Sequence, residues 1–124
     1  MAEATRAIVD AAKQKGPERV VMLSSFGVAR DRLTPVTKVV TGIAMGSQIK
    51  DKTAGEDVLR ASSLDWTIVY ATKLTNGPNT ESKVIPETTK AGISHKISRA
   101  AAASFLLQAA TDGLYNRRAV IITG

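Results

Sequence analysis

Two adjacent hydroxyl side chains, Ser24 and Ser25, directly follow the short apolar run Val20–Leu23. A continuous apolar run of this length is typical of a strand covered on both faces, as in a parallel sheet. Such sheets bind ligands in the crevice outside the carboxyl ends of their strands. The two serines therefore either contact a ligand or cap the end of a strand, and the residues alone leave both interpretations open.

The residue types that bind transition metals are almost missing. The chain has no cysteine and one histidine, His95. Thiolate sites, histidine-rich metal sites and disulfides are therefore excluded. His95 lies in a polar segment, where an isolated histidine is more often solvent-exposed than catalytic.

The chain has 124 residues and a formal net charge of +6, which raises the question of a polyanionic partner. Its basic residues are spread from Arg6 to Arg118, usually one or two at a time with acidic residues between them. No aromatic residue is interleaved with a basic cluster, as stacking on nucleic-acid bases would require. Nucleic-acid binding is therefore not expected, and a solvated basic surface, or one suited to phosphate-bearing ligands, is the better interpretation.

Membrane and export signals are not apparent in the sequence. No apolar run approaches the roughly 20 residues of a membrane-spanning helix. The first segment, Met1–Asp10, lacks the apolar core of a signal peptide. We therefore expect a cytoplasmic protein that does not contact a membrane.

The elements that must position the serines follow from the apolar pattern, which predicts helices alternating with strands in the order α-β-α-β-α-β. This order favours one domain with a parallel sheet of about three strands and helices on its faces. Val36–Gly46 is ambiguous, and Lys83–Ile85 is a further short extended candidate. The predicted helices are Glu3–Gln14, Gln48–Ser62 and Ser98–Thr111, with Ser98 as a helix N-cap, and the predicted strands are Arg19–Phe26, Leu64–Val69 and Ala119–Thr123.

A sheet of three strands exposes an edge, and proteins normally cover or pair such an edge. We therefore expect a homo-oligomer, most simply a homodimer, in which the edge of the sheet is covered.

Four segments, in this order and at this spacing, carry a family resemblance: RVVMLSSFGV at Arg19–Val28, KTAGEDVLRASSLDWTIV at Lys52–Val69, LTNGP at Leu74–Pro78 and ISRAAAASFLLQAATD at Ile97–Asp112. Together they resemble the C-terminal half of atypical short-chain dehydrogenase/reductases, including the NmrA-like and flavin/biliverdin-reductase-like branches. The resemblance implies a Rossmann-like α/β fold and NAD or NADP as cofactor. The Gly-rich turn that holds the pyrophosphate in this family has no counterpart in the sequence. We therefore expect residues 1–124 to form a single, partial Rossmann-like domain that lacks the N-terminal Gly-rich βαβ unit.

The resemblance also implies a catalytic set. Lys52 stands where the family has the lysine of a Tyr-x-x-x-Lys pair, whereas Gln48 stands in place of the tyrosine. An amide cannot serve as the general acid. The flavin/biliverdin-reductase-like branch instead uses the serine at the strand end, so the implied catalytic residues are Ser24, Ser25 and Lys52. A solvated helix lysine is the alternative for Lys52.

The cofactor contacts that the resemblance implies surround the ends of two strands. After the second strand the family usually reads R-P-G or P-P-x, whereas this chain reads Tyr70-Ala71-Thr72-Lys73. Tyr70 is then either a packed aromatic or a replacement acid near the cleft. In the closing helix, Ala101 stands where the family has aspartate. The implied cofactor-binding residues are Ser24, Phe26, Lys52, Tyr70, Ala71, Thr72 and Lys73.

Two functions follow as expectations. The first is the substrate-side half of an NAD(P)H-dependent reductase acting on a small carbonyl, quinone or flavin-like substrate. The second is a non-catalytic half-domain that self-associates or binds a partner protein. Affinity for a nicotinamide cofactor distinguishes the two.

Overall fold

The computed structural model describes residues 2–14, 19–25, 29, 32–45, 47–86, 90, 92 and 95–124. Its centre is a four-stranded sheet in the order β1-β2-β6-β4. The three parallel strands are β1 (Arg19–Ser25), β2 (Asp65–Ala71) and β6 (Arg118–Thr123). A short fourth strand, β4 (Lys83–Val84), pairs antiparallel with β6. The expected parallel sheet is confirmed, and the extended candidate at Lys83–Ile85 contributes its antiparallel edge.

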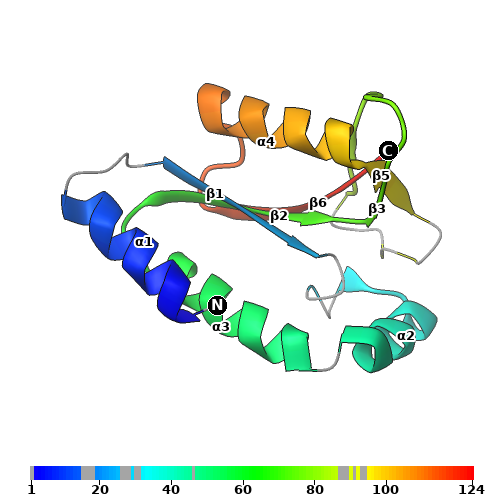
Figure 1. Ribbon diagram of the computed structural model, residues 1–124, viewed down its shortest axis with the longest axis horizontal. Helices are drawn as coiled ribbons and strands as arrows, with labels where there is room; N and C mark the ends of the chain where they lie inside the picture. The colour runs from blue at the N-terminus through cyan, green and yellow to red at the C-terminus, as the bar shows by residue number, and fades with distance from the viewer. Residues whose placement is uncertain are drawn as a thin grey trace.

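Helices cover both faces of this sheet. Figure 1 shows α4 on one face, α1 and α3 on the other, and α2 on the side of the molecule to which β1 points. A separate two-stranded parallel sheet, formed by β3 and β5, lies beside the ends of β2 and β6. The bounds of these elements are α1 Ala2–Gln14, α2 Pro35–Met45, α3 Ser47–Arg60, β3 Lys73–Thr75, β5 Lys96–Ser98 and α4 Arg99–Asp112.

Two apolar cores lie on the two faces of the sheet. Leu59 of α3 and Ile68 of β2 are fully buried in the core under α1 and α3. Phe105 of α4 packs with Ile97 and Ile122 in the core on the other face. Strands covered on both faces explain why their sequences read as continuous apolar runs rather than as alternating ones.

Both ends of α4 are capped. The hydroxyl of Ser98 accepts a hydrogen bond from the backbone N–H of Ala101 at 3.0 Å, as the predicted N-cap requires. Gly113, with φ of 63°, ends the helix and donates its N–H to the carbonyl of Ala109.

The amphipathic pattern of α2 is reversed. Thr37 and Thr41 are buried, with Thr37 only 1% exposed, whereas Ile43 is 82% exposed. Surface helices usually bury their apolar stripe and expose their polar one. The exposed apolar stripe of α2 consists of Val36, Val39, Val40 and Ile43.

Strand β1 forms one edge of the main sheet. It pairs with β2 along its whole length, from Arg19–Asp65 to Ser25–Ala71, and with no other strand among the described residues. The Arg19 side chain ties the start of this strand to α4, because its guanidinium donates to the carbonyl oxygens of Ala109 and Leu114. The edge is thus firmly placed, and its other side is free of pairing within the described part of the chain.

Candidate active site

A buried carboxylate, Glu56 of α3, lies at the centre of the polar groups near the strand ends. Only 1% of its surface is exposed. The hydroxyl of Ser24 donates to Glu56 Oε2 at 3.2 Å, and the phenol of Tyr70 donates to Oε1. Arg60, one turn further along α3, is 3.9 Å from Oε1 and donates to the Tyr70 oxygen at 3.0 Å. Three elements, β1, β2 and α3, therefore meet in one hydrogen-bonded network.

The strand register explains why these groups meet. Ser24 of β1 is paired with Tyr70 of β2, each one residue from the carboxyl end of its strand. Paired residues of neighbouring strands project to the same face of a sheet, and here that face is covered by α3. The i,i+4 spacing of Glu56 and Arg60 places both on one side of that helix.

The environment of Tyr70 holds its phenol protonated. Burial raises the pKa of Tyr70 above its ordinary value, and the hydrogen bond and negative charge of Glu56 raise it further, while Arg60 acts weakly in the opposite direction. Its proton is already donated to Glu56. Tyr70 is therefore a packed residue of the core that supports a buried network, and it is poorly suited to release a proton to a substrate.

Lys52 lies one helical turn from this network. It precedes Glu56 by four residues and is half-buried. Because α3 runs antiparallel to the strands it connects, Lys52 is displaced by about 6 Å toward the carboxyl edge of the sheet. Its ammonium forms no hydrogen bond or ion pair with any residue that the structure describes, Glu56 included. A half-buried ammonium near the carboxyl ends of the strands is suited to bind hydroxyl or phosphate oxygens of a ligand.

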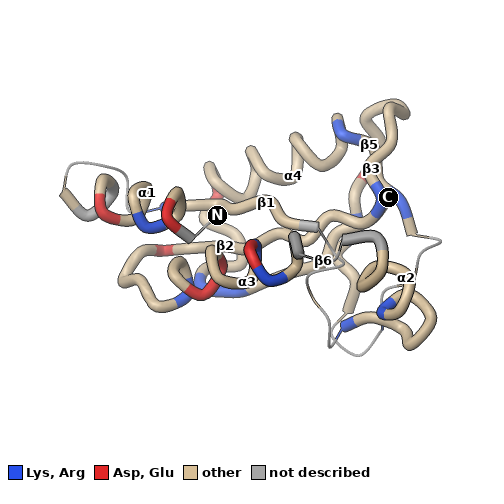
Figure 2. The backbone as a smooth tube through the Cα atoms, turned by 60° about the horizontal axis from the view of Figure 1, so that its bottom comes forward, with Lys and Arg blue, Asp and Glu red and all other residues tan. Residues whose placement is uncertain are grey.

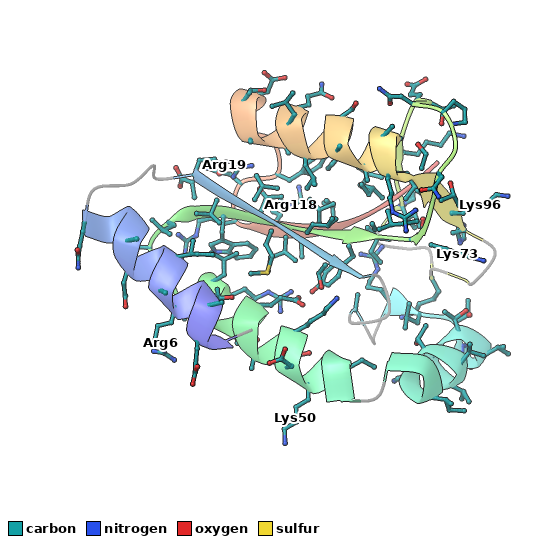
Figure 3. All side chains as sticks on the ribbon, viewed as in Figure 1. Arg6, Arg19, Lys50, Lys73, Lys96 and Arg118 are labelled. Atoms are coloured by element: carbon teal, nitrogen blue, oxygen red, sulfur yellow. The ribbon has the colours of Figure 1, made fainter. Side chains whose placement is uncertain are left out.

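The other expected site residues do not gather around Glu56. Ala71 is buried in the core beneath α4. The Thr72 hydroxyl donates to that of Thr123 at 3.2 Å, and Lys73 is exposed in β3, where it is paired with Lys96 (Figure 3). Of the segment 70–73, only Tyr70 therefore meets Ser24.

Two expected site residues, Ser25 and Phe26, cannot be placed in the site. Ser25 is the last residue of β1, and its backbone pairs with Ala71. Phe26 lies outside the described residues. Their expected roles as catalytic and cofactor-binding residues stay predictions.

An open cavity of about 580 Å³ lies at the carboxyl end of β6, beside the small β3–β5 sheet. Its size is in the usual range for small-molecule sites. His95 lines this cavity, and its ring Nδ1 lies 3.1 Å from the backbone N–H of Gly92. The lining consists of Thr75, Gly77, Pro78, Thr80, His95, Lys96, Ile97, Ser98, Thr123 and Gly124.

Sequence reasoning missed Glu56 and Arg60 as members of the site. An acidic residue in a helix is ordinarily solvated, and nothing in composition marks Glu56 as buried. The available signal was spacing, because Lys52, Glu56 and Arg60 recur every four residues on one stripe of the helix.

Two kinds of site are not found in the part of the chain that the structure describes. No three residues among its histidines, aspartates and glutamates are grouped to hold a metal ion. None of the helices it describes has the length and apolar character needed to span a bilayer.

The parallel sheet with helices on both faces defines a Rossmann-like domain. Residues 1–113 match the family of NAD(P)H-binding domains. The chain therefore belongs to the NAD(P)H-binding family. Among curated proteins, no match was found.

Solved structures confirm the fold. A short-chain dehydrogenase/reductase from Veillonella parvula, in complex with NADP, has a TM-score of 0.83 and 22% identity over 99% of this chain and 58% of its own. The anaerobilin reductase ChuY from Escherichia coli has a TM-score of 0.82 and 22% identity over 98% of this chain and 57% of its own. At such identity the likeness shows the fold alone. The chain thus spans less than two thirds of the length of these structures.

Proposed function

We propose that this chain forms the substrate-side part of an NAD(P)H-dependent reductase that acts on a small carbonyl, quinone or flavin-like substrate. The observation that carries the proposal is the half-buried ammonium of Lys52, which has no partner among the described residues and lies one turn from the Ser24–Glu56–Tyr70 network. Membership of the NAD(P)H-binding family and the likeness to reductases support it.

The residues present suit the nicotinamide end of a dinucleotide. Lys52 provides a cation for the hydroxyl groups of the adjoining ribose, and the Ser24 hydroxyl lies at the neighbouring strand end. No Gly-rich turn that would cradle the pyrophosphate occurs in this sequence. When bound, the reduced nicotinamide supplies a hydride to the substrate.

The chain's own contribution is then binding and orientation. Lys52 would hold the ribose of a bound cofactor near the carboxyl ends of β1 and β2. The cavity beside β3 and β5 receives the substrate on the side of β6. Tyr70 does not donate the proton that completes the reduction, since its own proton is held by Glu56. That proton comes from solvent.

Substitution of Lys52 tests the proposal directly. Lys52→Met keeps the aliphatic stem and removes the charge, and hydrogen bonds to charged groups contribute about 1.5–3 kcal/mol. We expect NADPH to bind the variant roughly 10- to 100-fold more weakly than the parent chain, as measured by titration of NADPH fluorescence. Reduced nicotinamide mononucleotide, which carries only the nicotinamide half, is expected to lose affinity by the same factor.

Lys50→Met is the matched control. Lys50 lies on the same helix, and its side chain extends away from the body of the protein into solvent (Figure 3). We expect its removal to leave NADPH affinity within about twofold of the parent chain. Absence of NADPH binding to the parent chain at millimolar concentration, or equal losses in both variants, would refute the proposed function.

A second candidate function is self-association, which the free side of β1 and the exposed apolar stripe of α2 favour. Both features are of the kind that proteins usually cover. In this proposal the occupant is a second copy of the same chain, and the dimer has no affinity for the cofactor.

A further inference from the structure

The hydrogen-bond network around Glu56 fixes the direction in which the Ser24 hydroxyl points its proton. A carboxylate has acceptors only, so every bond it makes must use a proton from its partner. The proton of Ser24 is directed to Oε2 and that of Tyr70 to Oε1. Each hydroxyl has one proton to give, and both are therefore committed.

The Ser24 hydroxyl can therefore only accept a further hydrogen bond. Its oxygen keeps two lone pairs, and no other hydrogen bond is made by this side chain within the described part of the chain. Ser24 retains 6% of its surface exposed, next to the carboxyl end of the sheet. A ligand atom that reaches this oxygen must be a donor, because a ligand carbonyl facing it would place two acceptors together.

The buried position of Glu56 disfavours turning the Ser24 proton toward a ligand. Turning the Ser24 proton toward a ligand would leave one oxygen of a buried carboxylate without its donor. Leaving a buried acceptor without a partner costs about 1–3 kcal/mol, and more when it is charged. Arg60 does not replace that donor, because it approaches Oε1, on the side of Tyr70.

We propose that Glu56 is a positioning residue that fixes Ser24 as a hydrogen-bond acceptor, so that the crevice selects a ligand group with an N–H donor. The inference rests on the proposed function, under which the carboxamide N–H of the nicotinamide is that donor. Ser24 then orients the ring of the cofactor, and it does not activate the carbonyl of a substrate.

The test compares NADPH with its reduced 3-acetylpyridine analogue, in which a methyl group replaces the amide nitrogen and the carbonyl is kept. A neutral hydrogen bond contributes about 0.5–1.5 kcal/mol. We expect the parent chain to bind NADPH about 2- to 13-fold more tightly than the analogue, as measured by fluorescence titration. The ratio of the two dissociation constants is the readout, because general damage to the fold weakens both ligands equally.

Two variants should remove the preference. Ser24→Ala deletes the acceptor, and we expect the ratio to fall to about 1. Glu56→Gln replaces one carboxylate oxygen by an amide donor, which releases the Ser24 proton and is expected to lower or invert the ratio. If Glu56→Gln does not fold, Ser24→Ala decides the question alone. Lys50→Met, on the solvent side of α3, is the control and should keep the parent ratio.

The outcomes distinguish failure of the proposed function from failure of the inference about Ser24. If the parent chain binds neither dinucleotide, the proposed function fails and this inference fails with it. If it binds both dinucleotides equally, or if Ser24→Ala keeps the parent preference, the role of Ser24 as an acceptor is refuted while the cofactor site stands. Preference for the acetyl analogue in the parent chain would show that Ser24 donates.

Discussion

Glu56 connects side chains from three elements, although its position in the sequence resembles that of an ordinary helix acid. Its two oxygens accept from Ser24 and Tyr70, and Arg60 supplies the compensating charge. A buried carboxylate is tolerated only when it is paired and hydrogen-bonded in this way. Ser24, which the sequence indicated as a site residue, therefore depends on Glu56, which it did not indicate.

The first prediction at this scale concerns alkaline pH. The pKa of Tyr70 is raised in the folded chain, whereas in the unfolded chain it is about 10. The stabilisation from Tyr70 is therefore complete below pH 10 and is lost progressively as the pH rises above it. At neutral pH we expect Tyr70→Phe to lower the free energy of unfolding by about 1–3 kcal/mol. Above pH 10, the difference between parent and variant should decrease, as measured by urea unfolding from pH 7 to 11.

Tyr115→Phe is the matched control for this experiment. It removes the chain's other tyrosine hydroxyl from a residue that packs on the α4 side of the sheet, away from Glu56. A pH dependence equal to that of Tyr70→Phe would show that the effect is not specific to the Glu56 network. A Tyr70→Phe difference that stays constant over the same range would contradict the assignment.

At the scale of elements, α4 shows how local sequence specifies structure. Ser98 lies at its start and Gly113 at its end, and both caps form. We expect Ser98→Ala to lower the free energy of unfolding by about 1 kcal/mol, because the N–H of Ala101 loses its acceptor. Ser98→Thr preserves the acceptor and should have little effect in the same thermal or urea unfolding measurement. Equal losses for both substitutions would mean that the effect comes from packing.

The elements that were predicted correctly are those in which the apolar residues of the sequence are the buried ones. The apolar runs at β1, β2 and β6 predicted strands correctly, because both faces of the sheet are covered. The segment Val36–Gly46 remained ambiguous for a physical reason. Its helix, α2, buries threonines and exposes valines, so its pattern of polarity is opposite to the usual one.

Other elements carried too little pattern to be found. Strands β3 and β5 have three residues each, and only their tertiary pairing identifies them. The site was predicted in part for the same reason. Lys52 and Ser24 stand in motifs, whereas the link between Ser24 and Tyr70 exists only through the register of two strands far apart in the sequence.

At the scale of the whole molecule, charge and apolar surface are distributed unevenly. Figure 2 shows both charge signs along α1 and α3, whereas α4 carries few charged residues over most of its length. The apolar stripe of α2 has no acidic residue beside it within that helix.

The prediction at this scale concerns the second candidate function. If copies associate through the α2 stripe, the double variant Val39→Lys, Ile43→Lys should shift the mass toward the monomer in sedimentation equilibrium at tens of micromolar. Stability should change little, because both side chains are largely exposed. Leu107→Lys, at an exposed apolar position of α4, is the control and should keep the parent mass. A parent chain that is monomeric throughout would exclude this association.

The position of β6 has a consequence for how the chain folds. This strand lies inside the sheet, between β2 and β4, yet it is the last described strand to be synthesised. Arg19 pairs with Asp65, and Thr67 with Arg118, so both parallel ladders join distant parts of the sequence. Such non-local pairing slows folding. During synthesis the edge of β2 that pairs with β6 therefore stays open until β6 has emerged, and an unpaired strand edge of this kind is prone to pair with other chains.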